Sequence, residues 1–387
     1  MEYKYERSTK LNGFRSAYAI QAVNAFVMGT VYIVVPLLML ERGIDVQSMG
    51  LIFAALPLVA QSARLAFGCI SDYAGRKLFY WLNAVANVAF LGAYYFAYGA
   101  AAFLAGKLLE GVRDASLWSV NRPYFMDHTD DAKERERVLT RLRSFNSVFE
   151  SLGMIFAGFI AAALAFGNTL LMLVAVSLLV LPNVAMLKDR VKQKVDFGAI
   201  RRSLDIRHKG RRFKNFLTIF FLLGLSWGFI TGYIMPFFLA TMGVPVQYIG
   251  LLLGVRVLFN GLSIYVFSSV WGVRRKVLVG GLLFSAAIAL LGLAPVSVLP
   301  LVVVAAGMIA GIADAGYESI FVIVSDRRSL GRDIGMLMTG VHVGMAITQA
   351  LSGFVIASLG FPTMFFAAAM LFALFSVASY HNMSLAD

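Results

Sequence analysis

Twelve long apolar segments run through this chain, and they leave little choice of fold. A helix that crosses a bilayer needs about 20 mostly apolar residues. The apolar runs are continuous rather than alternating, which excludes the strands of a membrane β-barrel. The segments are 13–40, 46–66, 78–98, 101–125, 143–166, 169–187, 215–242, 246–270, 276–294, 299–324, 333–358 and 361–380. The sequence therefore predicts an all-α membrane protein with twelve transmembrane helices.

The composition excludes the soluble classes of protein. The chain is 59% hydrophobic and 14% charged, whereas soluble proteins are about 45–50% apolar and about 25% charged. The first segment is too long for a signal peptide and has no cleavage site after it. One cysteine, Cys69, and four scattered histidines form no metal-binding pattern, and no nucleotide phosphate-binding loop is present. We expect no metal, no cofactor and no enzymatic activity.

Basic residues gather on one side of the twelve-span arrangement. Segment 188–214 holds eleven Lys and Arg residues, and the connection between the fourth and fifth spans, which includes Arg143, is also basic. The opposite side has only Arg42. Because Lys and Arg are retained in the cytoplasm, both termini are predicted to be cytoplasmic in a multi-pass protein of the cell membrane. The net charge of +13 then reflects topology and contact with lipids, not binding of nucleic acid.

The two halves of the chain align at an offset of 200 residues. The matching pairs are Pro36 with Pro236, Gly43 with Gly243, Gln47 with Gln247, Gly50 with Gly250, Gly111 with Gly311, Asp114 with Asp314, and Ala115 with Ala315. The repeat predicts two pseudo-symmetric six-helix bundles, residues 1–187 and 215–387, joined by a basic cytoplasmic linker at 188–214. Parallel repeats with a central site between them are a transporter arrangement.

The loop between the second and third spans carries a recognisable motif. It reads Gly68-Cys-Ile-Ser-Asp72-Tyr-Ala-Gly75-Arg76-Lys77. This resembles motif A of the major facilitator superfamily, G-x-L-x-D-x-x-G-R-K. The resemblance implies a monomeric transporter that works by alternating access. It also implies that Gly68, Asp72, Gly75, Arg76 and Lys77 form a gate that latches the two halves together.

The fourth and tenth predicted spans each contain two acidic residues, and a charge inside a span is costly and usually functional. Glu110 and Asp114 are four residues apart on one helix face, and Asp314 and Glu318 repeat that spacing in the second half. Neighbouring carboxylates raise each other's pKa, so these four residues are candidates for proton coupling. The resemblance implies that spans 1, 4, 7 and 10 line the central cavity, which would bring all four acids to the substrate.

Two intramembrane arginines are candidates for binding an anionic group. Arg113 is three residues from Glu110, so it can either neutralise Glu110 or bind a carboxylate or phosphate of the substrate, and the sequence leaves both roles open. Arg256 has no acid within one helical turn. Glu150 in the fifth span is a further partner for Arg113. Four aromatic residues on the cavity-lining spans are candidate cavity walls: Tyr32, Trp118, Trp227 and Tyr233.

The leading hypothesis is a proton-coupled symporter or antiporter that moves a small organic solute. A second hypothesis is a drug/proton antiporter that exports cationic or amphipathic compounds. Such antiporters of the superfamily carry a Gly-Pro-rich motif in the fifth span, where this chain reads Gly153-Met-Ile-Phe-Ala-Gly158 without the proline. A uniporter or lipid flippase of the same fold, or an integral-membrane protein that does not transport, would also be consistent with twelve spans and an internal repeat.

Overall fold

The computed structural model describes residues 2–127, 132–187, 209–325 and 330–384, and every regular element within these ranges is helical. The first half contains α1 (Glu2–Glu41), α2 (Val46–Ala74), α3 (Lys77–Tyr95), α4 (Ala100–Asp127), α5 (Ala132–Ser177) and α6 (Val180–Met186). The second half contains α8 (Arg211–Gly228), α9 (Ile234–Thr241), α10 (Val246–Val270), α11 (Val273–Arg275), the π-helical η1 (Lys276–Gly280), α12 (Gly281–Leu291), α13 (Leu299–Val324) and α14 (Leu330–Ser384). The expected linker at 188–214 falls largely outside the described residues.

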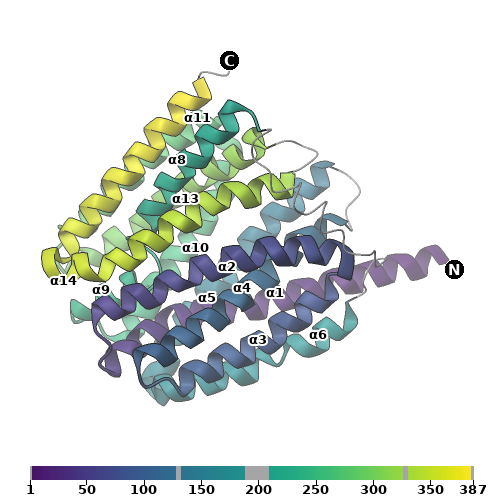
Figure 1. Ribbon diagram of the computed structural model, residues 1–387, viewed down its shortest axis with the longest axis horizontal. Coiled ribbons are helices and arrows are strands. Elements are labelled where there is room, and N and C mark those ends of the chain that lie inside the picture. Colours follow the sequence, from purple (N-terminus) through teal and green to yellow (C-terminus); the bar gives the residue numbers. More distant parts are fainter. Residues whose placement is uncertain (1, 128–131, 188–208, 326–329, 385–387) are drawn as a thin grey trace.

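These helices fit the twelve predicted spans. The longest two, α5 and α14, each contain one residue with left-handed φ, Ala165 at 65° and Gly360 at 78°. Each break separates two spans, so the predicted loops there shrink to a single residue. The seventh span is α8 and α9 with an interruption at Gly232, whose φ is 67°. In Figure 1 the early helices, in purple and blue, gather in the lower part and the late helices, in green and yellow, in the upper part.

The internal repeat is visible in the backbone. Gly43 and Gly243 both adopt left-handed φ, at 72° and 77°, in the turns that follow α1 and α9. The next helix is preceded in each half by an extended residue, Asp45 or Pro245. The two glycines lie at the same end of the molecule, which we call the Gly43 end, because an even number of spans separates them. The opposite end, where α2 ends, is called the Gly75 end.

Glycines let the spans approach closely within each half. A Cβ on Gly29 of α1 would lie 2.1 Å from the carbonyl oxygen of Glu150 on α5. A Cβ on Gly224 of α8 would lie 2.0 Å from the carbonyl oxygen of Val341 on α14. A real Cβ could not lie this close to a carbonyl oxygen, so the two backbones approach each other here only because glycine has no side chain. Other pairs of membrane helices also meet through small residues. The same kind of crossing therefore supports both bundles.

The two halves meet through α2 packed on α14 and α5 packed on α10. Gly50 and Gly250, which are repeat mates, lie at these two contacts. A Cβ on Gly50 would lie 2.7 Å from the carbonyl oxygen of Gln349, and one on Gly250 would lie 2.5 Å from that of Met154. The contact between the halves therefore follows the same pseudo-symmetry as the halves themselves.

Candidate functional site

Glu110 forms a buried ion pair with Lys107, one turn before it on α4. The Nζ of Lys107 lies 2.8 Å from Oε2 of Glu110, and the exposed fractions of the two side chains are 3% and 2%. The hydroxyl of Tyr94 on α3 donates a hydrogen bond to the same carboxylate oxygen. The Lys107 Nζ also lies 3.9 Å from the centre of the Phe53 ring. The Glu110 carboxylate is therefore engaged by its own half of the protein.

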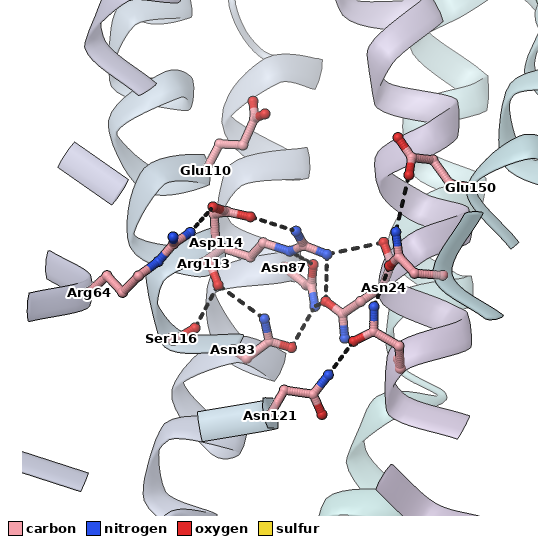
Figure 2. Close-up of polar contacts among 12 residues, drawn as sticks. Asn24, Arg64, Asn83, Asn87, Glu110, Arg113, Asp114, Ser116, Asn121 and Glu150 are labelled. Atoms are coloured by element: carbon pink, nitrogen blue, oxygen red, sulfur yellow. Dashed lines mark hydrogen bonds and ion pairs between the residues drawn. The ribbon is translucent and has the colours of Figure 1, made fainter. Parts of the chain in front are cut away.

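Asp114, one turn further along α4, interacts with different bases. Its carboxylate oxygens lie 3.4 Å from Nη2 of Arg64 and 3.8 Å from Nη1 of Arg113. Figure 2 shows Asp114 between these guanidinium groups, with Glu110 pointing away from them. Of the partners open to Arg113, the structure shows an ion pair with Asp114 rather than with Glu110. The two α4 carboxylates therefore contact different bases, Lys107 for Glu110 and Arg64 with Arg113 for Asp114.

Arg113 lies at the centre of a buried amide network that joins α1, α3 and α4 (Figure 2). Its Nε donates to Oδ1 of Asn87 at 3.0 Å, and its Nη2 donates to Oδ1 of Asn24 at 2.6 Å. Asn83 donates to the Arg113 carbonyl oxygen at 3.2 Å. The Nε and Nη2 groups of this candidate substrate-binding arginine are thus already bonded to protein acceptors.

A second chain of amides crosses the first half and ends at Glu150. The hydroxyl of Tyr80 donates to Asn121 at 3.0 Å, and Asn121 in turn donates to Gln21. Gln21 donates to Asn146, which donates to Oε2 of Glu150 at 3.1 Å. Sequence reasoning that searched for charges did not find either amide network. Uncharged amides within predicted spans are themselves a signal, because a polar group in the bilayer core needs a partner.

Glu150 faces basic residues from both halves instead of Arg113. It lies within electrostatic range of Arg143 on α5 and Arg256 on α10. Asp314 on α13 lies within range of the same two arginines and accepts a hydrogen bond from Asn260 at 2.9 Å. All four charged residues are half-buried. We call Arg143, Glu150, Arg256 and Asp314 the central charge cluster. Arg143 is therefore not a simple basic residue of the connection between spans.

Glu318 forms an ion pair across the two halves. Its Oε1 lies 4.0 Å from Nη2 of Arg122 on α4, and the two side chains are 37% and 35% exposed. Both residues lie toward the Gly75 end of their helices. At the Gly43 end the halves meet through apolar packing, where the ring centres of Phe53 and Tyr233 are 5.2 Å apart. The two halves are thus in buried apolar contact at the Gly43 end and in exposed polar contact at the Gly75 end.

The four candidate aromatic residues have different surroundings. Tyr32 lies beside Arg256 and Glu150 at the central charge cluster. The ring of Trp227 packs edge-on against that of Tyr317, with centres 5.3 Å apart. Trp118 lies under the guanidinium of Arg122, whose Cζ is 5.4 Å from the ring centre. Tyr233, in contrast, is fully buried and pairs its hydroxyl with Ser352 at 2.8 Å.

The motif between α2 and α3 forms a tight turn. Gly75 ends α2 with a φ of 91°, a left-handed conformation that favours glycine, and its amide donates to the carbonyl of Ser71. The Nζ of Lys77 donates to the carbonyl of Ala185 at 2.8 Å, which ties α3 to the end of α6. The backbones of Gly68 and Arg76 belong to this turn and its flanking helices, while the side chain of Asp72 lies outside the described residues.

Comparison with known proteins identifies relatives of this fold. The sequence model of the Major Facilitator Superfamily matches residues 17–268, more than half of the chain. No curated protein sequence gives a significant match.

Three solved transporter structures resemble the protein over nearly its whole length. A mutant of the nucleoside transporter NupG is 17% identical with a TM-score of 0.75, covering 98% of this chain and 100% of that one. NupG itself is 14% identical with a TM-score of 0.73, covering 97% and 99%. The human organic anion transporter MFSD10 is 16% identical with a TM-score of 0.67, covering 95% and 99%. At these identities the resemblance shows the fold alone.

Proposed function

Because the chain belongs to the Major Facilitator Superfamily, we propose that it is a secondary active transporter of a small organic solute. The solute binds between the two halves and crosses by alternating access. The central charge cluster is the observation that carries this proposal. Arg143 and Glu150 come from the first half, Arg256 and Asp314 from the second, and a site built from both halves can change its exposure when the halves rock.

The contacts between the halves support a state that opens toward the Gly75 end. Apolar packing around Phe53 and Tyr233 excludes water at the Gly43 end. At the Gly75 end the Arg122–Glu318 pair is about one-third exposed and held at 4.0 Å. The topology proposed from the basic residues puts that end and both termini in the cytoplasm of the cell. The solute would therefore leave or enter from the cytoplasm in this state.

We further propose that transport is coupled to protons, with Asp314 and Glu318 as the main carriers. Asp314 is half-buried, and the hydrogen bond that its carboxylate accepts from the described residues comes from the amide of Asn260, so it can lose or gain a proton without breaking a contact ion pair with any of them. Glu110 and Asp114 are less suited to this task, because their ion pairs, at 2.8 and 3.4 Å, are closer and less exposed than the 4.0 Å pair of Glu318 with Arg122. In this proposal those two residues maintain the first half rather than exchange protons.

The motif residues Gly68, Asp72, Gly75, Arg76 and Lys77 are proposed as the gate at the cytoplasmic end. We also propose that the chain acts as a monomer whose two bundles, residues 1–187 and 215–387, are joined by the basic linker. The tight turn at Gly75 supports the gate, since it fixes where α2 and α3 meet.

Flux measured in proteoliposomes with an imposed pH gradient tests the function. We expect uptake of at least one organic solute to follow the gradient, and Asp314→Asn to abolish the dependence on pH. Asp45→Asn, at an exposed turn, is the control and should leave flux unchanged. Flux that ignores the gradient would instead identify a uniporter or flippase.

Three carboxylates favour the second candidate, a drug/proton antiporter: Glu150 and Asp314 in the central charge cluster, and Glu318 one turn further along α13. In that case lipophilic cations should leave the vesicle lumen in exchange for protons.

A further inference from the structure

The charges of this protein are arranged in two different ways. In the first half, Lys107 and Glu110 are in contact at 2.8 Å, and Asp114 lies within 3.4 Å of Arg64. In the central charge cluster, by contrast, the described residues contain no direct ion pair that involves Arg143 or Arg256. Charges that are not in direct contact with an opposite charge can each take a group of a ligand as a partner.

The carboxylates of the central cluster already have donors from the protein. Asn146 donates to Glu150 at 3.1 Å, and Asn260 donates to Asp314 at 2.9 Å. Glu318, the next acid along α13, has Arg122 at 4.0 Å. A cationic ligand would therefore compete with partners that these carboxylates possess.

The two guanidinium groups are in the opposite situation. The Nε of Arg143 is buried and has no hydrogen-bond acceptor among the described residues. Among the residues that the structure describes, Arg256 interacts with the hydroxyl of Tyr32 and, at longer range, is attracted to Glu150 and Asp314. A guanidinium carries five N–H donors, and within the described parts of the chain the Tyr32 hydroxyl is the one side-chain acceptor found for this pair of arginines. The guanidinium groups of the central charge cluster therefore have donors available for the acceptor atoms of a ligand.

Backbone packing positions both arginines. The Cγ of Arg256 lies against Gly307 of α13, where a Cβ would come within 2.6 Å of it. On α5, two turns beyond Arg143, the hydroxyl of Ser151 donates to the carbonyl of Gly254 at 2.8 Å, which fixes α5 against α10. The stems of the two arginines are thus held on helices from different halves that pack directly on each other.

We propose that Arg143 and Arg256 together bind the anionic group of the transported solute, a carboxylate or a phosphate. This inference deepens the proposed function and rests on it. Planar guanidinium groups bind such groups through paired, charge-assisted hydrogen bonds. Glu150 and Asp314 are positioning residues that balance the two arginines when no anion is bound. Because one arginine belongs to each half, the bound anion joins the halves across α5 and α10.

The experiment measures ligand-induced thermal stabilisation of the purified full-length protein. The probes are benzoate, succinate and inorganic phosphate as anions, and tetraphenylphosphonium as a cation. We expect at least one anion to stabilise the protein, and Arg143→Gln and Arg256→Gln each to weaken its binding by about tenfold or more. Arg275→Gln, which removes one exposed positive charge at the end of α11, is the matched control and should bind normally.

Two further variants test whether the site prefers an anion to a cation. Glu150→Gln removes a competing charge, so it should strengthen binding of the anion. Arg143→Lys keeps the charge but not the fork of donors and should bind with intermediate affinity, which also covers the case in which Arg143→Gln does not fold. Stabilisation by the cation that is lost in Glu150→Gln, or anion binding that survives both arginine substitutions, would overturn the inference.

The anion site and the transport function can fail independently of each other in these experiments. Proton-driven flux of a neutral or cationic solute that persists in Arg143→Lys and Arg256→Lys would uphold the transporter and overturn the anion site. Anion binding that depends on both arginines, in a protein without measurable flux, would uphold the site and overturn transport.

Discussion

Lys107 lies between the carboxylate of Glu110 and the ring of Phe53, 2.8 Å from the one and 3.9 Å from the centre of the other. The same Phe53 ring packs on Tyr233 of the second half. A buried ion pair in the first bundle is therefore in contact with the apolar seal between the bundles. Disturbing the pair should affect both the stability of the first half and the closure of the Gly43 end.

Replacing Lys107 with Met should strongly destabilise the protein. The substitution leaves the Glu110 carboxylate buried and unpaired, and breaking a buried pair in this way costs about 3–5 kcal/mol. The double variant Lys107→Met/Glu110→Gln should recover much of this loss, because no lone charge remains. Thermal unfolding in detergent measures both, and equal losses in the single and double variants would contradict the prediction.

Gly250→Ala should separate α5 from α10. The new Cβ would lie 2.5 Å from the carbonyl oxygen of Met154, and overpacking of this kind typically costs about 1–3 kcal/mol. Gly92→Ala on α3 is the matched control, because no atom lies within 4 Å of its added Cβ. Unfolding midpoints of the two variants should differ clearly, and identical midpoints would refute the close approach.

Asn87→Ala should destabilise the first half without changing solute affinity. It removes the acceptor of the Arg113 Nε, and an unsatisfied buried donor costs about 1–3 kcal/mol. Asn183→Ala, which removes an amide with an exposed hydrogen bond, serves for comparison. A stable Asn87→Ala protein with weakened solute binding would instead place Arg113 in the binding site.

The Arg122–Glu318 pair should contribute little to stability. Both side chains are about one-third exposed and 4.0 Å apart, and such pairs are worth about 0–1 kcal/mol. A double-mutant cycle with Arg122→Gln and Glu318→Gln measures the coupling energy directly. A coupling well above this range would show that the contact between the halves at the Gly75 end is held mainly by this pair.

Asp45 should make a pH-dependent contribution to the start of α2. Hydrogen bonds from the hydroxyl and amide of Ser48 hold the pKa of Asp45 below its ordinary value of 3.8. The native state therefore favours the ionised form, and the contribution is complete at neutral pH. It is lost as the pH falls through 3.8 toward the lower native pKa. The difference in unfolding midpoint between the wild type and Asp45→Ala should shrink over that interval, and a constant difference would contradict this assignment.

The spans and the repeat could be predicted because both depend on local features. Apolar length specifies a membrane helix, and the matched turns at Gly43 and Gly243 need the same left-handed residue. The offset of 200 therefore indicates equivalent places in the two halves.

The pairing of charges could not be predicted in the same way. The spacing of Glu110 and Arg113 permits an ion pair, but Lys107 and Tyr94 bind Glu110 instead. Arg143 follows several arginines that are predicted to be cytoplasmic, and the packing of α5 against α10, which itself packs on α13, brings it near Asp314. Apart from Lys107, which is on the same helix as Glu110, these partners come from other helices, and the sequence alone does not show which helix faces meet.

The one-residue joins at Ala165 and Gly360 also determine how the molecule appears from outside the bilayer. Both lie at the Gly43 end, where the other described connections are four residues long at 42–45, 96–99 and 242–245, and seven residues long at 292–298. Apart from 292–298, this end presents almost no chain for a protease to cleave or an antibody to hold, and an epitope inserted at the one-residue joins would have to break a helix. Binders and fusion partners should therefore be directed to 292–298 or to the Gly75 end.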